Sequence, residues 1–248
     1  MSTHPQPPVD TPVDAPIEVD AVVLVGGQGT RLRPLTLSAA KPMLPTAGVP
    51  FLEHLLSRIH QVGIRHVVLG TSYKAETFTE YFGDGSAAGL DIEYLVEDEP
   101  LGTGGAIRNV GGTLRADTVM VFNGDILSGL DLSTLLATHH ENNADVTLHL
   151  VKVADPRAFG SVPTDPDGRV QAFLEKTDNP PTDQINAGCY VFRRSVLESI
   201  PAAGWCRWSG RPSPGCWPRV RGCSATSTRR IGWTWALPPR SCADRPTW

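Results

Sequence analysis

The chain has 248 residues, of which 40% are hydrophobic, enough for one large α/β domain or two small ones. No apolar run approaches the roughly 20 residues of a membrane-spanning helix, so we expect no membrane segment. The net charge of −4 hides an asymmetry, because residues 201–248 carry eight arginines and one acidic residue. The remaining chain has 14 basic and 25 acidic residues, and this acidic body argues against nucleic-acid binding.

The first 20 residues contain five prolines and have neither a basic n-region nor an apolar h-region. This composition predicts a disordered leader over 1–20 and not a signal peptide. We therefore expect a cytoplasmic protein.

Short apolar runs alternate with amphipathic segments over residues 21–200. Strands are predicted at Ala21–Val25, Ile64–Leu69, Ile92–Val96, Thr118–Phe122, Val146–Val153, Val170–Leu174 and Ala187–Phe192. Helices are predicted at Phe51–Val62, Ala75–Phe82, Gly105–Val110, Leu132–His139 and Ser195–Ser199. The alternation favours an α/β fold with a doubly wound, mostly parallel sheet. Ligands of such sheets bind beyond the carboxyl ends of the strands.

A glycine-rich loop follows the first predicted strand, with Gly26, Gly27 and Gly29 ahead of Arg31 and Lys41. Glycine lets backbone N–H groups approach phosphate oxygens, and the cations neutralise their charge. The loop lacks the Gly-Lys-Ser/Thr of a Walker A motif, and its glycine spacing differs from the dinucleotide fingerprint. An ordinary turn is the alternative, but the clustered cations favour a phosphate-binding site.

A second motif, Asn-Gly-Asp ending at Asp125, follows the apolar strand predicted to end at Phe122. A carboxylate at a strand end can hold Mg²⁺, which prefers oxygen ligands and bridges phosphate oxygens. The alternative is an Asx turn. Because this strand end lies at the same sheet edge as the glycine loop, we expect a magnesium site there.

Val23–Thr36 together with Lys41–Pro45 resembles the signature of the sugar-1-phosphate nucleotidyltransferases, most of all the mannose-1-phosphate guanylyltransferase branch. The resemblance implies a Rossmann-like fold in which the loop wraps a nucleoside triphosphate. It implies that Arg31 and Lys41 contact the phosphates, and that Asp125 binds the metal. Ala40 departs from the proline that the family usually has before this lysine. The implied nucleotide-binding residues of the loop are Gly26, Gly27, Gly29, Thr30 and Arg31.

Four later segments continue the resemblance in the family's order. Glu99–Ala106 is similar to the loop that holds base and ribose, which implies contacts at Gly102 and Thr103. The segments that resemble the family's sugar side are Phe159–Val162, Phe173–Lys176 and Asn186–Tyr190. They imply sugar or sugar-phosphate contacts at Gly160, Glu175, Lys176 and Asn186. Taken alone, the Glu-Lys pair reads as a solvated strand end and the last segment as a core strand.

The implied reaction is nucleotidyl transfer from GTP to mannose-1-phosphate, with Mg²⁺ as cofactor and Arg31, Lys41, Asp125 and Lys176 as catalytic residues. One alternative is uridylyl or thymidylyl transfer to glucose-1-phosphate. Another is a catalytically dead remnant that only binds sugar nucleotides. The expected partners are the two substrates, without nucleic acid or membrane, and the sequence leaves a homo-oligomer open.

The resemblance stops at Ile200, and residues 201–248 hold all six tryptophans and four of the five cysteines. The family's Trp-x-Asp-x-Gly-Thr-Pro segment, which carries a second metal-binding aspartate, is missing. Reading the codons of residues 231–238 one base earlier forces its Asp and Gly and permits Trp-Leu-Asp-Leu-Gly-Thr-Pro. We interpret the tail as frameshifted, expect it to be disordered or misfolded, and expect weak or no activity from the chain as written.

Overall fold

The computed structural model describes residues 17–200 except Gln28, Tyr73, 98–100 and Glu175, and the backbone of 223–228 and 233–234. The main sheet contains β1 (Val19–Leu24), β4 (His66–Thr71), β5 (Asp91–Val96), β6 (Thr118–Asn123), β8 (Val146–Lys152), β9 (Gln184–Arg193) and β10 (Cys223–Thr228). The strands β2 (Pro45–Thr46) and β3 (Val49–Pro50) form one small ribbon, and β7 (Ile126–Leu127) and β11 (Trp233–Thr234) form another.

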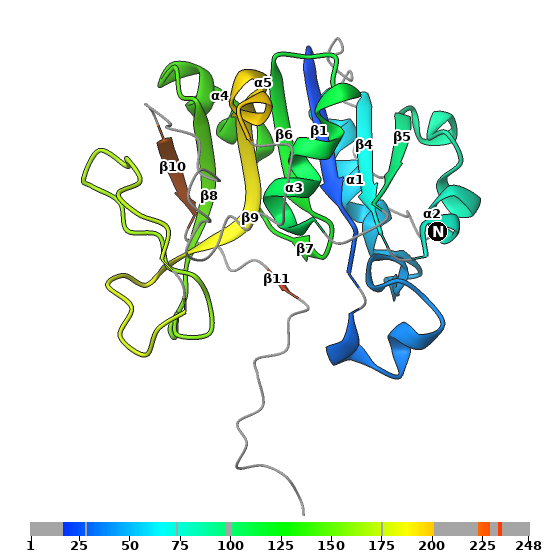
Figure 1. Cartoon of the computed structure of the whole chain (residues 1–248), viewed down its shortest axis with the longest axis horizontal. Coiled ribbons are helices and arrows are strands. Elements are labelled where there is room, and N and C mark those ends of the chain that lie inside the picture. Colours follow the sequence, from blue (N-terminus) through cyan, green and yellow to red (C-terminus); the bar gives the residue numbers. More distant parts are fainter. Residues whose placement is uncertain are drawn as a thin grey trace, which may run out of the picture.

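The sheet is mostly parallel, as predicted, with the strand order β10-β8-β9-β6-β1-β4-β5 (Figure 1). Strand β1 lies at its centre and runs parallel to both β4 and β6. The exception is β9, which runs antiparallel to β6 and to β8. The carboxyl ends of β4 and β6 and the first half of β9 therefore lie at the edge where β1 ends.

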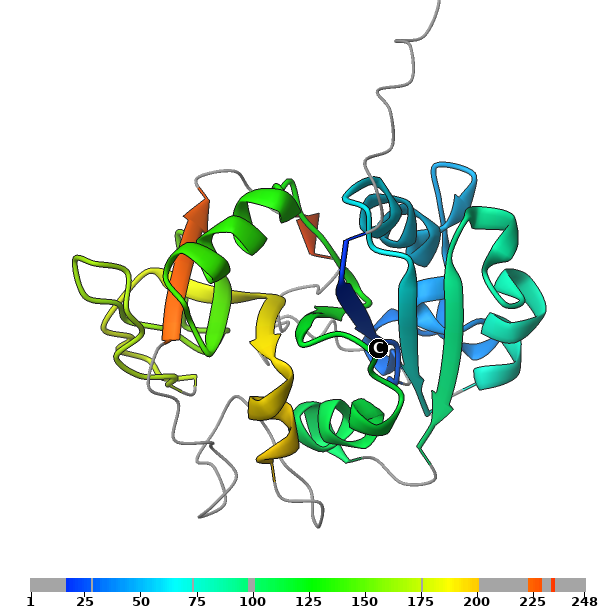
Figure 2. The ribbon, with the colours of Figure 1, turned by 90° about the horizontal axis from the view of Figure 1, so that it is seen from above.

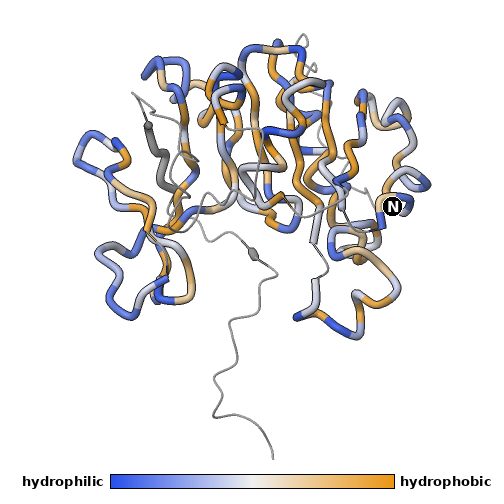
Figure 3. The backbone as a smooth tube through the Cα atoms, viewed as in Figure 1, coloured by the Kyte–Doolittle hydropathy of each residue, from blue (hydrophilic) through white to orange (hydrophobic). Residues whose placement is uncertain are grey.

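The helices cover both faces of the sheet, which makes the fold doubly wound (Figure 2). They are α1 (Phe51–Gln61), α2 (Ala75–Phe82), α3 (Gly102–Asn109), α4 (Leu132–Glu141) and α5 (Arg194–Glu198). One core lies between the sheet and α1, α2 and α4, and the other between the sheet and α3 and α5. Figure 3 shows the hydrophobic residues concentrated along the strands. In the described part of the chain, no helix is long and apolar enough to cross a membrane.

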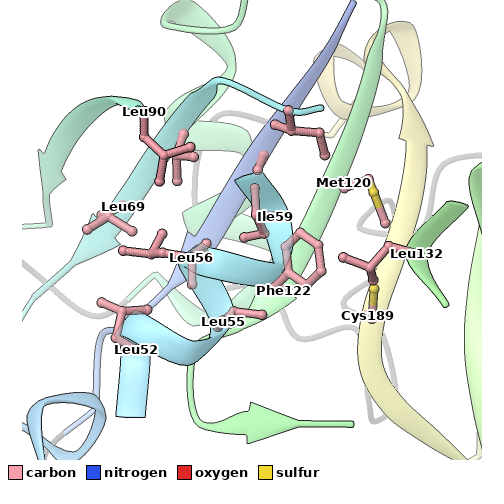
Figure 4. Close-up of a cluster of buried hydrophobic side chains, with 14 of the residues drawn as sticks. Leu52, Leu55, Leu56, Ile59, Leu69, Leu90, Met120, Phe122, Leu132 and Cys189 are labelled. Carbon is pink, nitrogen blue, oxygen red and sulfur yellow. The ribbon is translucent and has the colours of Figure 1, made fainter. Parts of the chain in front are cut away.

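Helix α1 shows how the sequence pattern builds this arrangement. Its residues Leu52, Leu55, Leu56 and Ile59 recur with helical spacing and are all nearly inaccessible to solvent. Figure 4 shows them packed against the sheet in the first core. Burying such a side chain stabilises the fold by about 1.5–3 kcal/mol, so this stripe fixes α1 against the strands.

The strand predicted at Val170–Leu174 is wrong. This segment makes only isolated bridges, from Val170 to Thr164 and from Leu174 to Ser161. Pro163 interrupts the opposite segment, because proline has no N–H to donate to a continuous ladder. The other predicted elements are present with shifted ends, and α3 begins at Gly102, three residues before its predicted start.

The two ends of the chain fall mostly outside the described residues. Strand β1 begins at Val19, inside the stretch predicted as leader, while residues 1–16 are not described. In the predicted tail, β10 pairs in parallel with β8, and β11 pairs with β7. The expectations for the rest of the tail, including the frameshift, concern residues outside the described part.

Candidate functional site

The glycine loop at the end of β1 folds back on itself. Gly29 has φ 56°, and a Cβ there would lie 2.9 Å from Thr36 Cγ2 and 3.2 Å from Lys41 Cβ. The buried Thr36 hydroxyl donates to the Gly29 carbonyl over 2.9 Å. Glycine is required because other residues rarely adopt this φ and because the space is already filled. The closure brings Lys41 beside Gly29.

The Asn-Gly-Asp motif packs against the same end of β1. The Gly124 N–H donates to the Leu24 carbonyl over 2.9 Å, and a Cβ on Gly124 would lie 2.9 Å from that oxygen. No larger residue fits this approach without displacing the backbone. The contact places Asp125 next to the glycine loop, at the predicted edge of the sheet.

Lys41 and Asp125 meet although 84 positions separate them in the chain. Lys41 Nζ lies 2.6 Å from Asp125 Oδ2. The lysine side chain is 16% exposed and the aspartate side chain 44% exposed. Together they form the charged wall of a cleft of about 280 Å³. The other lining residues are Leu32, Leu35, Leu44, Pro45, Thr46 and Phe51.

The remaining loop residues lie toward the solvent. Thr30 and Arg31 are exposed in a short 3₁₀ turn, Thr30–Leu32, that begins directly after Gly29. Gly26 and Gly27 are exposed as well, and a Cβ on Gly27 would meet nothing within 4 Å. The loop therefore presents backbone and the exposed arginines Arg31 and Arg33 to whatever enters from solvent.

The predicted base-and-ribose segment forms the start of α3. Gly102 has φ 70° and Thr103 follows in the first turn, where backbone N–H groups have no partner within the helix. Burial raises the pKa of the nearby Glu97, although the Leu101 N–H donates to its carboxylate over 3.4 Å. These features place a helix N-terminus and a half-buried carboxyl group at the carboxyl end of β5.

The predicted sugar-side residues come from three segments that meet at β9. Ser161 exchanges backbone hydrogen bonds of 3.0 and 2.9 Å with Leu174, and it also bridges to Ile185. Gly160 and the exposed Lys176 therefore flank a ribbon that adjoins the start of β9. Glu175 lies outside the described residues.

Asn186 is held by its own strand. Its Nδ2 donates to the Tyr190 hydroxyl, and its Oδ1 accepts from the Gly188 N–H over 3.1 Å. A Cβ on Gly188 would lie 2.6 Å from Asn123 Nδ2, so β9 approaches the Asn-Gly-Asp motif closely. Burial raises the pKa of Tyr190 to about 12, which keeps its hydroxyl protonated as a hydrogen-bonding partner.

Three residues that shape the site through contacts within the protein were not predicted from the sequence. These are Thr36, which closes the loop, and Gly124 and Gly188, which allow the close approaches. Gly124 carried a signal, because it stands inside the Asn-Gly-Asp motif. Thr36 and Gly188 also stand inside segments that carry the family resemblance, Val23–Thr36 and Asn186–Tyr190, but the residues alone did not indicate their contacts.

A family model and several known proteins match most of this chain. The family model described as nucleotidyl transferase matches residues 20–205. Mannose-1-phosphate guanylyltransferase of Mycobacterium tuberculosis is 72% identical over 184 residues, covering 74% of this chain and 51% of that protein. D-glycero-alpha-D-manno-heptose 1-phosphate guanylyltransferase of Aneurinibacillus thermoaerophilus is 38% identical over 180 residues, covering 73% and 77%.

The fold is also similar to a solved structure, HddC from Yersinia pseudotuberculosis complexed with GMP-PN. The TM-score is 0.73 at 29% identity, over 88% of this chain and 94% of that chain. The chain spans about half the length of the mycobacterial relative, although it covers more of the shorter one from Aneurinibacillus.

Proposed function

This chain belongs to the nucleotidyl transferase family, and on that basis we propose that it transfers a guanylyl group from GTP to mannose-1-phosphate. The products are GDP-mannose and pyrophosphate. The observation that carries the proposal is the Lys41–Asp125 pair at the glycine loop, inside the cleft. The name of the mycobacterial relative supports this reaction, and the GMP-PN bound to HddC supports guanine as the base.

The reaction is an in-line displacement at phosphorus. A phosphate oxygen of mannose-1-phosphate attacks the α-phosphorus of GTP, a new P–O bond forms, and the bond to the β-phosphate breaks. The leaving group is pyrophosphate. Catalysis consists of positioning and charge neutralisation, without a covalent intermediate on the protein.

The loop acts on the triphosphate. Backbone N–H groups of Gly26, Gly27 and Gly29 would bind phosphate oxygens, with Thr30 beside them. Arg31 and Lys41 would neutralise the charge that accumulates on the leaving pyrophosphate. Lys41 already faces one anion, Asp125, so an incoming triphosphate offers its ammonium group a second one.

Asp125 fits a magnesium ion by the chemistry of its donor. Its carboxylate is half-exposed and lines the cleft, and Mg²⁺ is bound through one or two carboxylates plus substrate phosphates and water. Among the described residues, no group of three or more His, Cys, Asp or Glu side chains gathers into a metal site. An ion held by Asp125 would supply positive charge that neutralises the phosphates during transfer.

The remaining predicted residues form two groups. Gly102 and Thr103 would hold base and ribose at the start of α3. The sugar phosphate would be held by Lys176, and the sugar itself by Glu175, the Gly160 backbone and Asn186. The ribbon beside β9 supports this assignment, because it brings Gly160 and the start of β9 together.

The test is pyrophosphate release by the purified full chain from GTP, ATP, UTP and dTTP, each with mannose-1-phosphate and with glucose-1-phosphate. We expect GTP with mannose-1-phosphate to exceed every other combination by about tenfold or more, since site contacts of about 1.4 kcal/mol give that ratio. A maximum with UTP or dTTP and glucose-1-phosphate would overturn the assignment. Tight GTP binding without pyrophosphate release in any combination would show that the chain binds the nucleotide but does not catalyse the transfer.

A further inference from the structure

Helix α1 connects the two chain segments that carry Lys41 and Asp125. At its start, the Phe51 N–H donates to the Leu44 carbonyl over 3.0 Å. One turn later, His54 Nε2 lies 2.8 Å from the Thr46 carbonyl oxygen. The start of the helix is therefore fixed to the segment that directly follows Lys41.

Near the other end of α1, Arg58 reaches the segment that follows Asp125. Its Nη1 donates to the Ser128 carbonyl and its Nη2 to the Leu130 carbonyl, 70 and 72 positions along the chain. Leu130 is 2% exposed and belongs to the same core as the apolar face of α1. The guanidinium group therefore binds a segment whose position is already restrained by packing.

The form of this contact restrains angle as well as distance. A planar guanidinium group that donates to two carbonyls spaced two residues apart fixes the orientation of the peptide between them. The same segment is held at Gly124 by β1 and at Asp131, whose carboxylate accepts from the Ser133 N–H over 3.0 Å at the start of α4. Between these two ends, β7 pairs with β11, and Arg58 ties the segment to α1.

We infer that Arg58 is a positioning residue that holds Asp125 at bonding distance from Lys41 through α1, and so sets the affinity of this pair of residues for a metal–triphosphate. The inference rests on the proposed function. It assigns Arg58 no contact with substrate. The carbonyl groups it binds lie three and five positions beyond Asp125 in the chain.

Arg65 provides a matched control just beyond the same helix. Its Nη1 donates to the His60 carbonyl over 2.8 Å and to the Ile64 carbonyl over 3.1 Å. These bonds close the C-terminal end of α1 and do not reach the Asp125 segment. Replacing either arginine with methionine removes donors to two backbone carbonyls. Only Arg58→Met removes bonds between α1 and the segment that follows Asp125.

The experiment uses the full chain and measures two quantities. One is the rate of pyrophosphate release, and the other is Mn²⁺–GTP binding, detected by electron paramagnetic resonance. Arg58→Met is expected to raise the Mg²⁺ concentration for half-maximal rate about tenfold and to weaken Mn²⁺–GTP binding about equally. Arg58→Lys keeps the charge but loses the planar group that donates to both carbonyls. Its Mg²⁺ dependence and Mn²⁺–GTP affinity are expected to lie between those of Arg58→Met and wild type. Arg65→Met is expected to match wild type. Wild-type metal dependence in a folded Arg58→Met chain, or an equal loss in Arg65→Met, would overturn the inference.

A second readout separates this inference from the proposed function. If the wild-type chain neither binds GTP nor releases pyrophosphate, the proposed function fails, and crystal structures of Arg58→Met and Arg58→Lys then decide the role of Arg58. The expected result is a Lys41 Nζ–Asp125 Oδ2 separation longer than 2.6 Å in one or both variants. An unchanged separation in both would overturn the positioning role.

Discussion

Aspartates lie at both ends of β1, and they differ in burial and in hydrogen bonding. Near the start of the strand, Asp20 is 3% exposed and accepts from His66 Nδ1 over 2.8 Å and from the backbone N–H groups of Arg115 and Ala116. Beyond the other end, Asp125 is 44% exposed, and within the described part of the chain its one hydrogen-bonding partner is Lys41. A carboxylate whose acceptors are all used inside the protein holds the fold together, whereas a half-exposed one with a single partner is available to a ligand.

The network around Asp20 ties three strands at the edge opposite the site. His66 Nε2 lies 3.2 Å from Glu93 Oε1, and Arg115 pairs with both Glu93 and Asp91. Burial alone would raise the pKa of Asp20, but the hydrogen bonds from His66 and the backbone outweigh it and lower the pKa. The Asp20 carboxylate is thus ionised in the folded chain at neutral pH.

The largest expected effect comes from the Lys41 side of the comparison. Lys41→Met should lower the rate of nucleotidyl transfer about 10²- to 10³-fold, because it removes a positioned cation from the developing charge. Since the pair is partly exposed, the free energy of unfolding should change by less than about 1 kcal/mol. Pyrophosphate release and urea unfolding measure the two quantities.

The control for that variant is Lys152→Met, because Lys152 also pairs with an aspartate, Asp183, at 3.5 Å, but away from the cleft. Its rate should equal that of wild type. A comparable loss in both variants would contradict a special role for Lys41.

Asp20→Asn should give the next largest effect, on stability alone. It leaves buried donors around position 20 without an anionic partner, so the free energy of unfolding should fall by about 2–3 kcal/mol. Asp91→Asn is the control, because the Asp91 side chain is more than half exposed. This substitution should lower the free energy of unfolding by less than about 0.5 kcal/mol. Urea unfolding distinguishes the two, and equal losses would mean that burial does not set the value of the Asp20 bonds.

Gly124→Ala should give a smaller loss of stability, about 1–2 kcal/mol, because its Cβ would lie 2.9 Å from the Leu24 carbonyl oxygen and 2.6 Å from Val25 Cγ1. Gly27→Ala is the matched variant, since its Cβ would meet nothing within 4 Å. Its unfolding free energy should stay within about 0.5 kcal/mol of wild type. If the two variants unfold alike in urea, close packing does not explain the glycine of the Asn-Gly-Asp motif.

The smallest expected effect is a pH dependence at the Asp20 end. Burial favours the neutral ring of His66, but the hydrogen bond and charge of Asp20 outweigh burial and raise its pKa. The resulting stability is fully present below the unfolded pKa of about 6.5 and is lost as pH rises through the higher folded value. His66→Gln should therefore cost more unfolding free energy at pH 6 than at pH 8.

His139 serves as a control, because its contribution to stability changes with pH in the opposite direction. Burial lowers its pKa to about 4, so its contribution is present above pH 6.5 and is lost as the pH falls toward 4. His139→Gln should cost more at pH 7 than at pH 4.5. A His66→Gln cost that is the same at pH 6 and pH 8 would show that the ring is not charged in the folded chain.

Elements with a periodic pattern, and the one long-range contact that follows from the edge rule of parallel sheets, could be predicted from sequence, whereas other long-range contacts could not. Apolar spacing located α1, and the edge rule for parallel sheets predicted that the glycine loop and Asp125 would meet. The antiparallel insertion of β9 between β6 and β8 depends on contacts between distant segments, which periodicity does not record. The same holds for Arg58, whose partners lie 70 and 72 positions away on backbone carbonyls that have no side-chain signature.

The most direct test is a single-turnover reaction with the full chain in excess over GTP, with mannose-1-phosphate and Mg²⁺, comparing wild type with Asp125→Asn. Excess protein makes GDP-mannose detectable even when turnover is slow, as the missing second aspartate motif leads us to expect. We expect GDP-mannose from wild type and a rate at least about 100-fold lower in a folded Asp125→Asn chain. Equal rates in the two chains would contradict the claim that the Lys41–Asp125 pair is the reaction centre.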